Sequence, residues 1–186
     1  MRKSKEEAAQ TRKRIVTAAA REFRESGVVA TGLSDLMKAA GLTHGGFYKH
    51  FESKDQLVEE ACAEAVDRLI ETMSAAAARG GSKAVAATYL SPVHRDYPSQ
   101  GCVLAAIGSE LSRADEKTRA VVTGGFLKLV DIMAGHDVKI PPEVARRRAL
   151  VAVSTMIGAL TMSRIVTDPV LSAEILKEAE QSLAKG

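Results

Sequence analysis

The feature that most restricts the fold is a pair of short helical patterns that meet at Gly41. The pattern over residues 33–40 ends there, and Gly41 can adopt the left-handed conformation that follows a helix. Thr43 has a side chain suited to cap the next helix, which carries Phe47 and Phe51 four positions apart on one face. Two short helices joined by so tight a turn predict a helix-turn-helix, whose second helix is free to enter the major groove of DNA.

The rest of the chain predicts helices, because apolar residues recur at helical spacing and no strand-like alternation is present. We expect further helices over residues 10–26, 54–78, 83–90, 102–112, 115–134, 142–166 and 172–184. Breaks, loops or frayed ends are expected at residues 1–9, 79–82, 94–101, 135–142 and 167–169. The fold class is therefore all-α with about nine helices, divided into a helix-turn-helix domain over residues 1–53 and a larger helical domain over residues 54–186.

Positive charge is concentrated in the first third of the chain. Residues 1–54 contain 11 Lys and Arg against 6 Asp and Glu, whereas the rest contains 15 against 17. A basic segment on an otherwise near-neutral chain is typical of a domain that binds a polyanion such as DNA, although a solvated basic surface gives the same count.

The second helix of the motif supplies most of the candidate DNA contacts. Its exposed face and its flanks carry Thr43, His44, Gly45, Gly46, Tyr48, Lys49 and His50. Two adjacent glycines weaken a helix by roughly 1 kcal/mol each relative to alanine, which indicates close approach of the backbone to DNA, the alternative being a flexible turn. Lys54 follows the expected helix cap Ser53, and its charge opposes the dipole of that helix. It is therefore a candidate for binding a phosphate, unless it is a simple solvated lysine.

A longer pattern extends over nearly all of the N-terminal domain at fixed spacing. It comprises Thr11–Ile15, Ala18, Ala19, Phe23, Gly27, Ala30, Thr31, Ala39–Thr43, Gly45, Phe47, Tyr48, Phe51, Ser53–Asp55 and Leu57. With these residues the chain resembles the TetR/AcrR family over residues 10–60. It departs from the family pattern at Gly32 and Ser34, where many relatives have Ser or Thr and then a larger polar residue such as Arg.

The resemblance implies a homodimeric, cytoplasmic regulator of transcription that binds a double-stranded DNA operator. Such proteins are usually repressors, and a small hydrophobic ligand in the helical body usually moves the two DNA-binding domains and releases the operator. By analogy, DNA contacts are expected at Thr31, Ser34, Thr43, His44, Gly45, Tyr48, Lys49, His50 and Lys54. The last two helices of the family commonly form a four-helix dimer interface.

The helix expected over residues 142–166 is the main candidate for dimerisation. The candidate interface residues are Val151, Ser154, Gly158, Thr161, Ile165, Leu171 and Ile175. Their spacing gives an apolar face with small residues, and an exposed face of this kind requires a partner. The alternative is a helix at the centre of one chain. The most apolar stretch, residues 149–162, is shorter than the roughly 20 residues that span a bilayer, so we expect a buried helix and no membrane segment.

The middle helices are expected to surround a ligand pocket. The candidate wall residues are Met73, Tyr89, Leu104, Ile107, Phe126, Met133, Met156 and Leu160. Methionine adapts to ligands of different shapes, although ordinary core packing explains each residue equally well. His94, Arg95 and Asp96 lie in an expected loop and are candidates either to gate a ligand or to form plain loop surface.

Cys102 is a candidate redox sensor, because it lies at an expected helix start, where the helix dipole lowers a thiol pKa; a small buried residue is the alternative. It is 40 residues from Cys62, which indicates no disulfide framework and suits a reducing cytoplasm. The four histidines, His44, His50, His94 and His136, lack metal-ligand spacing, so no metal or cofactor is expected.

An enzyme is disfavoured, because the sequence contains no phosphate-binding loop, no HExxH motif and no nucleophile elbow. The remaining alternative is a DNA-binding protein that is architectural or controlled by a protein partner and takes no small ligand.

Overall fold

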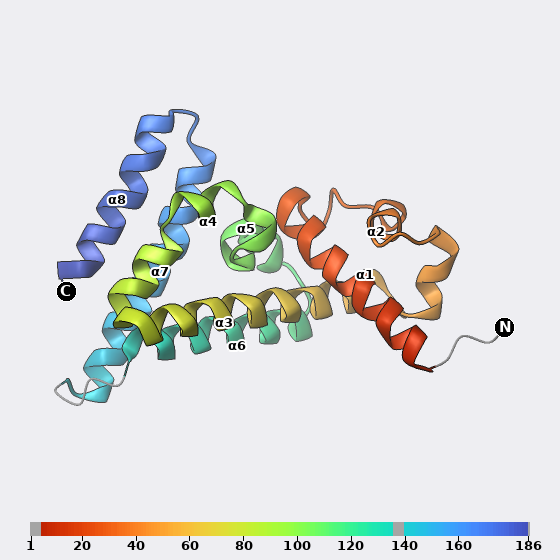
Figure 1. The fold of residues 1–186 in the computed structure, drawn as a ribbon, viewed down its shortest axis with the longest axis horizontal. Coiled ribbons are helices and arrows are strands. Elements are labelled where there is room, and N and C mark those ends of the chain that lie inside the picture. Colours follow the sequence, from red (N-terminus) through yellow and green to blue (C-terminus); the bar gives the residue numbers. More distant parts are fainter. Residues whose placement is uncertain (1–4, 136–139, 186) are drawn as a thin grey trace.

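The computed structural model describes residues 5–135 and 140–185, and within these ranges it contains helices and no strand (Figure 1). The helices are α1 (Lys5–Ser26), α2 (Leu33–Ala39), η1 (His44–Lys49), α3 (Lys54–Tyr89), α4 (Pro92–Asp96), η2 (Pro98–Gln100), α5 (Val103–Leu111), α6 (Glu116–Ala134), α7 (Pro142–Ile165) and α8 (Pro169–Lys185), of which η1 and η2 are 3-10 helices. The all-α prediction is confirmed. The predicted linker over residues 135–142 lies partly outside the described residues, as does His136.

Helices α1, α2 and η1 and the first turns of α3 form a small N-terminal body, here called the head. Ile15 of α1, Leu36 of α2 and Phe47 of η1 are fully buried in its core, together with Leu57 of α3. Helix α1 begins earlier than predicted. Glu6 and its acidic neighbour lie in its first turn, where negative charge is favourable, and good helix formers follow.

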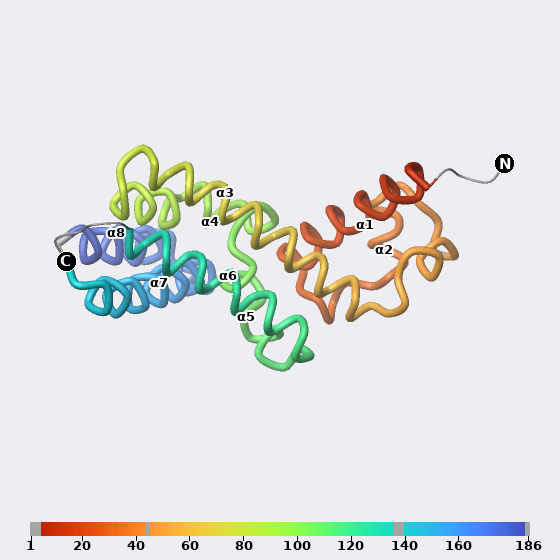
Figure 2. The backbone as a smooth tube through the Cα atoms, turned by 90° about the horizontal axis from the view of Figure 1, so that it is seen from below, coloured from red at the N-terminus to blue at the C-terminus, as the bar shows by residue number. Residues whose placement is uncertain are grey.

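Helix α3 connects the head to the larger helical body (Figure 2). Its first half contributes Leu57 to the head core and its middle contributes Met73 to the body core. The predicted break near residues 79–82 is confirmed as a kink, because Gly80 and Gly81 have non-helical backbone angles and Gly81 has a φ of 63°. The positive φ explains the glycine, since other residues rarely adopt it.

The body is built from the second half of α3 and helices α4 to α8. Helix α6 runs along α3, and a Cβ on Gly125 of α6 would lie 2.6 Å from Cγ1 of Val66 on α3. Only glycine therefore allows the two helices to approach this closely. Val153 and Met156 of α7 are fully buried in the body core.

The prediction of an irregular loop over residues 94–101 is wrong in part, because α4 and η2 occupy most of this segment. Ser91 caps α4 by accepting a hydrogen bond from the His94 N–H at 3.2 Å, and Pro92 is the first helical residue. A serine followed by proline is a helix-start signal. Pro92 also ends the preceding helical pattern, and this second role conceals the signal.

Candidate nucleic-acid interface

The second element of the motif is the 3-10 helix η1, where an α-helix was predicted. Its backbone bonds run from Gly46 N–H to the Thr43 carbonyl and from His50 N–H to the Phe47 carbonyl, at 3.1 and 2.9 Å. The Thr43 side chain makes no capping bond, so that prediction was wrong. Adjacent glycines weaken the α-helix, which explains the tighter and shorter winding.

Aromatic packing fixes η1 on the head. Phe47 is fully buried and stacks on Phe51, with ring centroids 5.5 Å apart. Arg12 of α1 lies over the Phe51 ring at 4.5 Å, donates to the His50 carbonyl at 3.2 Å, and forms a bidentate ion pair with Glu60 of α3. Arg12 therefore ties the end of η1 to α1 and α3 at once.

The packing leaves one side of the motif exposed. Ser34, Thr43, Gly45, Tyr48 and Lys49 are all exposed, and Tyr48 retains 70% of its accessible surface. These residues offer hydroxyl and ammonium donors and one open stretch of backbone, since nothing lies within 4 Å of a Cβ built on Gly45. The arrangement can contact phosphate oxygens and base edges in a groove.

Other predicted contact residues lie differently. A Cβ on Gly46 would lie 3.4 Å from the methyl group of Met37, so this glycine borders the head core. His50 is half-buried, and the His44 side chain is outside what the structure describes. Gly45 is thus the glycine that fits the predicted close approach of backbone to DNA.

Thr31 and Lys54 have structural roles that their sequence positions did not reveal. The Thr31 side chain is buried and donates to the Gly27 carbonyl at 2.5 Å. The Lys54 ammonium donates to the carbonyls of Val28 and Thr31 at 2.6 and 2.7 Å. The Thr31 hydroxyl, expected by analogy at the DNA, is thus bonded within the head. Lys54 holds the loop before α2, with only its third N–H left for another acceptor.

Apolar residues of α5, among them Val103 and Leu111, pack into the head core, and two side-chain hydrogen bonds that were not predicted from the sequence also connect the body to the head. Glu110 of α5 accepts from the Val29 N–H at 2.8 Å, in the loop before α2. Arg24 of α1 is 5% exposed and donates to the Ser99 carbonyl in η2, with Nε at 3.0 Å. The spacing of apolar residues along a helix does not indicate which residues far apart in the sequence will form hydrogen bonds. The available signal in α1 is that Arg24 follows Val16 and Ala20 at helical spacing, which places it in line with two buried residues.

The predicted ligand-pocket residues form mainly a packed core. Tyr89, Met156 and Leu160 are fully buried in the body core. Ile107 is buried instead in the cluster that includes the head core residues Ile15 and Phe47. Leu104, Phe126 and Met133 pack against the body core. Met73 is buried and also lines a cavity of about 240 Å³ between α3 and the α4–η2 segment, here called the α4 cavity.

His94 lies at the inner wall of the α4 cavity. Its Nδ1 is 2.7 Å from the Tyr89 carbonyl, and its Nε2 accepts from the Cys102 N–H at 2.9 Å. These bonds require a neutral ring with the proton on Nδ1. The pKa of His94 is lowered to about 4, mainly by burial; the hydrogen bond to the Tyr89 carbonyl opposes this shift, and the charges of Arg164 and Arg24 add to it.

This buried histidine predicts a specific pH dependence of stability. Because the pKa of His94 is about 4 in the folded protein and near 6.5 otherwise, the unfolded chain binds the proton first as pH falls. Unfolding free energy should drop by about 2 kcal/mol between about pH 7.5 and about pH 5. Urea titrations at the two pH values measure this drop, and the His94→Gln variant should lack it. An equal drop in both proteins would mean that other groups cause the loss of stability. Asp96 and Asp115 are not such groups, because their pKa values are lowered from 3.8 and they titrate below this pH range.

Cys102 does not have the predicted reactive environment. Its side chain is 1% exposed, and burial raises the pKa of its thiol. The preceding α4–η2 segment covers the helix start, so loss of solvation outweighs the helix dipole. The prediction of a low-pKa redox sensor is therefore not supported by the structure. Cys62 is similarly buried, with its pKa raised to about 12.

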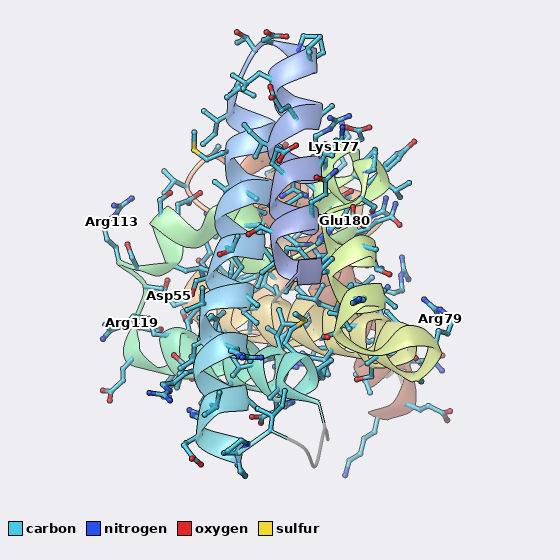
Figure 3. All side chains as sticks on the ribbon, turned by 90° about the vertical axis from the view of Figure 1, so that its left-hand side faces the viewer. Asp55, Arg79, Arg113, Arg119, Lys177 and Glu180 are labelled. Carbon is cyan, nitrogen blue, oxygen red and sulfur yellow. The ribbon has the colours of Figure 1, made fainter. Side chains whose placement is uncertain are left out.

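Helices α7 and α8 lie side by side and leave an apolar face uncovered (Figure 3). Val151 and Ile165 of α7 are 66% and 63% exposed, and Ser154 and Gly158 between them are also exposed. Leu171 of α8 is 42% exposed and Ile175 is half-buried. Thr161 points inward instead and donates to the Ala105 carbonyl at 3.2 Å. Met162, which is 46% exposed, takes its place in the stripe.

The uncovered face corrects the expectation that residues 149–162 form a buried helix. Within the described ranges α7 is the single helix long and apolar enough to cross a membrane, yet only 28% of that stretch is buried inside the chain. An apolar helix with one face packed on its own chain is also what an interface between subunits requires.

Comparison with known proteins identifies the fold. The model of the family "Bacterial regulatory proteins, tetR family" matches residues 15–61. An uncharacterized HTH-type transcriptional regulator of Mycobacterium tuberculosis is 30% identical over 168 residues, which cover 84% of this chain and 86% of that protein. The chain belongs to the TetR family. The family resemblance found in the sequence is thereby confirmed.

Other members of the TetR family match the head more strongly. The HTH-type transcriptional regulator TtgR of Pseudomonas putida is 46% identical over 59 residues. The match covers 32% of this chain and only 28% of the length of that relative. The probable acrEF/envCD operon repressor of Escherichia coli is 41% identical over 59 residues, which cover 32% of this chain and 27% of that protein. A solved TetR transcriptional regulator from Chloroflexus aurantiacus superposes with a TM-score of 0.80 at 29% identity, over 97% of this chain and 95% of that one.

Proposed function

We propose that the protein is a homodimeric transcriptional repressor that binds operator DNA through the exposed side of η1 and leaves it when a small ligand binds the body. The observation that carries the proposal is the outward presentation of Tyr48 and Lys49 on a 3-10 helix anchored by the fully buried Phe47. Repression as the direction of control is supported by the name of the Escherichia coli relative. A DNA-binding regulator of this kind acts in the cytoplasm.

The DNA contacts that we propose are Ser34, Thr43, Gly45, Tyr48 and Lys49. All five are exposed and lie in α2, in η1 or directly before η1. Hydroxyl groups and an ammonium group position a protein on the phosphate backbone, and an open backbone at Gly45 permits close approach to the groove. His44 and His50 remain predicted contacts, and the third N–H of Lys54 is available to a phosphate.

A second copy of the chain is the proposed occupant of the α7–α8 face. Its exposed apolar side chains, led by Val151 and Ile165, would otherwise remain in water. A twofold dimer through this face presents two heads to two half-sites of one operator, as helix-turn-helix dimers do.

Operator selection tests the proposal most directly. Purified protein is incubated with fragments of its source genome, and the retained fragments are sequenced and confirmed by gel shift against random DNA. The proposal expects a recurrent, twofold-symmetric sequence bound at least a thousandfold more tightly than random DNA. Equal binding to all fragments, or none in dilute salt, would contradict it.

The Lys49→Ala variant separates phosphate binding from sequence recognition. It should weaken binding to operator and random DNA alike, and it should lower the slope of log affinity against log salt by about one if the ammonium neutralises a single phosphate. Lys177→Ala is the matched control, since Lys177 is an exposed lysine of α8 at the far end of the body (Figure 3). A salt slope that is unchanged in Lys49→Ala would remove this lysine from the interface.

A further inference from the structure

A basic hollow lies on the outer face of α1, between this helix and the end of α2. Its volume is about 870 Å³, and it is here called the basic trough. The residues of its lining that matter here are Lys13, Arg14, Thr17, Arg21 and Glu22 of α1 and Ala40 directly after α2. Three of these side chains are basic and one is acidic, so the trough carries an excess of positive charge.

The chain itself does not neutralise this charge. Among the residues that the structure describes, Lys13, Arg14 and Arg21 form no salt bridge, and all three are exposed. Arg14 donates to the Ala40 carbonyl at 2.6 Å, which holds its guanidinium at the trough. A guanidinium has five N–H groups and an ammonium has three, so donors remain for an acidic partner.

The basic trough faces away from the proposed DNA contacts. Arg12 lies on the side of α1 that meets η1, because it donates to the His50 carbonyl and covers the Phe51 ring. Arg14 and Arg21 are two and nine residues further along the helix. At about 3.6 residues per turn, both positions fall on the opposite side of α1. We therefore do not expect DNA held at η1 to cover the trough.

A second hollow, of about 480 Å³, lies between α1 and α3, which pack across each other (Figure 1). It is here called the acidic hollow, and its charged lining residues are Lys13 of α1 with Glu60, Glu64, Asp67, Arg68 and Glu71 of α3. Ion pairs within the chain engage two of the four carboxylates, since Glu60 pairs with Arg12 and Glu64 with Arg68. The other two carboxylates are left for a partner.

Asp67 and Glu71 are these remaining acids. They lie four residues apart on α3, which places them on one face of the helix. Both are exposed, and Asp67 has a long contact of 3.7 Å with the exposed Lys128. Glu71 forms no salt bridge within the described ranges. This flank of α3 therefore carries an excess of negative charge.

The basic trough and the acidic hollow are neighbours. Lys13 lines both of them, and Thr17 of the trough donates to Glu64 of the acidic hollow at 2.9 Å. Two copies related by a twofold axis meet through the same surface, so the basic region of each copy can face the acidic region of the other. A surface with adjacent regions of opposite charge is therefore complementary to itself.

We propose that this α1–α3 surface binds a second copy of the chain, with Lys13 and Arg21 of each copy opposite Asp67 and Glu71 of the other. The surface is separate from the α7–α8 face, so it joins one dimer to the next. A single exposed ion pair contributes little, but the twofold axis repeats each contact, and neighbouring operators hold two dimers at high effective concentration. This use on DNA rests on the proposed function, whereas the contact between copies does not.

Sedimentation equilibrium of the full chain at millimolar concentration tests the proposal in dilute salt and in about 1 M salt, which screens charges beyond about 3 Å. In dilute salt the protein should form an assembly at least twice as heavy as the unit found at high salt. Lys13→Glu with Arg21→Glu makes the trough acidic, and Asp67→Lys with Glu71→Lys makes the α3 flank basic. Each double variant should associate at least tenfold more weakly than the wild type, because like charges then face each other.

Mixing the two double variants separates this contact from a general effect of net charge. The exchanged surfaces are complementary again, so the mixture should recover the association that each variant lacks alone. Arg79→Glu with Arg119→Glu is the matched control, since both arginines are exposed outside this surface and the net charge changes equally (Figure 3). This control should associate as the wild type does. A wild-type protein that stays dissociated in dilute salt, or a mixture that does, would overturn the proposal.

Gel shifts with one operator and with two adjacent operators are read separately. Absence of binding to a single operator would refute the proposed function and leave the sedimentation result standing. Independent binding to two adjacent operators at every spacing would refute the use of the contact on DNA. If Lys13→Glu with Arg21→Glu lost single-operator binding but kept the association, the trough would hold DNA, and the proposal would be wrong.

Discussion

Replacing Phe47 by alanine is expected to destabilise the protein by about 3–5 kcal/mol and to abolish operator binding. Phe47 is fully buried, stacks on Phe51, and meets Tyr48 edge-on at 5.1 Å between ring centroids. Its removal leaves a cavity beneath η1 and frees the segment that presents the proposed DNA contacts. Urea unfolding and gel shifts measure the two effects.

Tyr48→Ala is the matched control for this prediction. Tyr48 is the adjacent aromatic residue and is 70% exposed, so its loss should change stability by no more than about 0.5 kcal/mol while operator affinity still falls. Hydrogen exchange should show faster exchange of α2 and η1 amides in Phe47→Ala, with α7 still protected. A Phe47→Ala protein that keeps wild-type stability and operator affinity would refute the anchoring role.

Introducing a charge on the α7–α8 face should dissociate the protein into monomers. In Ile165→Asp a carboxylate replaces a side chain that is 63% exposed in the single chain and buried in the proposed dimer. Burial of an unpaired carboxylate is strongly unfavourable, and twofold symmetry introduces it twice. A monomer engages one half-site, so operator affinity should fall by about a hundredfold or more.

Analytical ultracentrifugation and gel shifts on the same samples measure this prediction. Val29→Asp is the control for association, since Val29 is a strongly exposed apolar residue (85%) in the loop before α2 and belongs to neither α7 nor α8. That variant should keep the wild-type association state. If Ile165→Asp sediments as the wild-type protein does, the interface lies on another face.

Local chemistry made much of the fold predictable. Gly27 and Gly41 both have positive φ and follow α1 and α2 as expected, and Ser53 accepts from the Gln56 N–H at 3.1 Å as the expected cap of α3. These signals depend on residues within a few positions of each other. They therefore require no knowledge of the rest of the fold.

Contacts between distant segments could not be predicted in the same way. The inward direction of Lys54 depends on where the loop before α2 passes, and the burial of Cys102 depends on the α4–η2 segment that covers it. Helical spacing indicated the stripe on α7 but did not distinguish the inward Thr161 from the exposed Met162. Such distinctions depend on small rotations of a helix that one sequence does not specify.

The hydrogen bond between Arg24 and Ser99 has a consequence for how this protein can diverge. The acceptor is a main-chain carbonyl, so it is present whatever side chain position 99 carries. The donor, in contrast, is a guanidinium that a lysine reproduces only in part, because a single ammonium lacks the planar fork. Substitutions at position 99 should therefore keep this hydrogen bond, whereas substitution of Arg24 should break it, so the side chains of the segment beside the α4 cavity can change while the segment stays connected to α1.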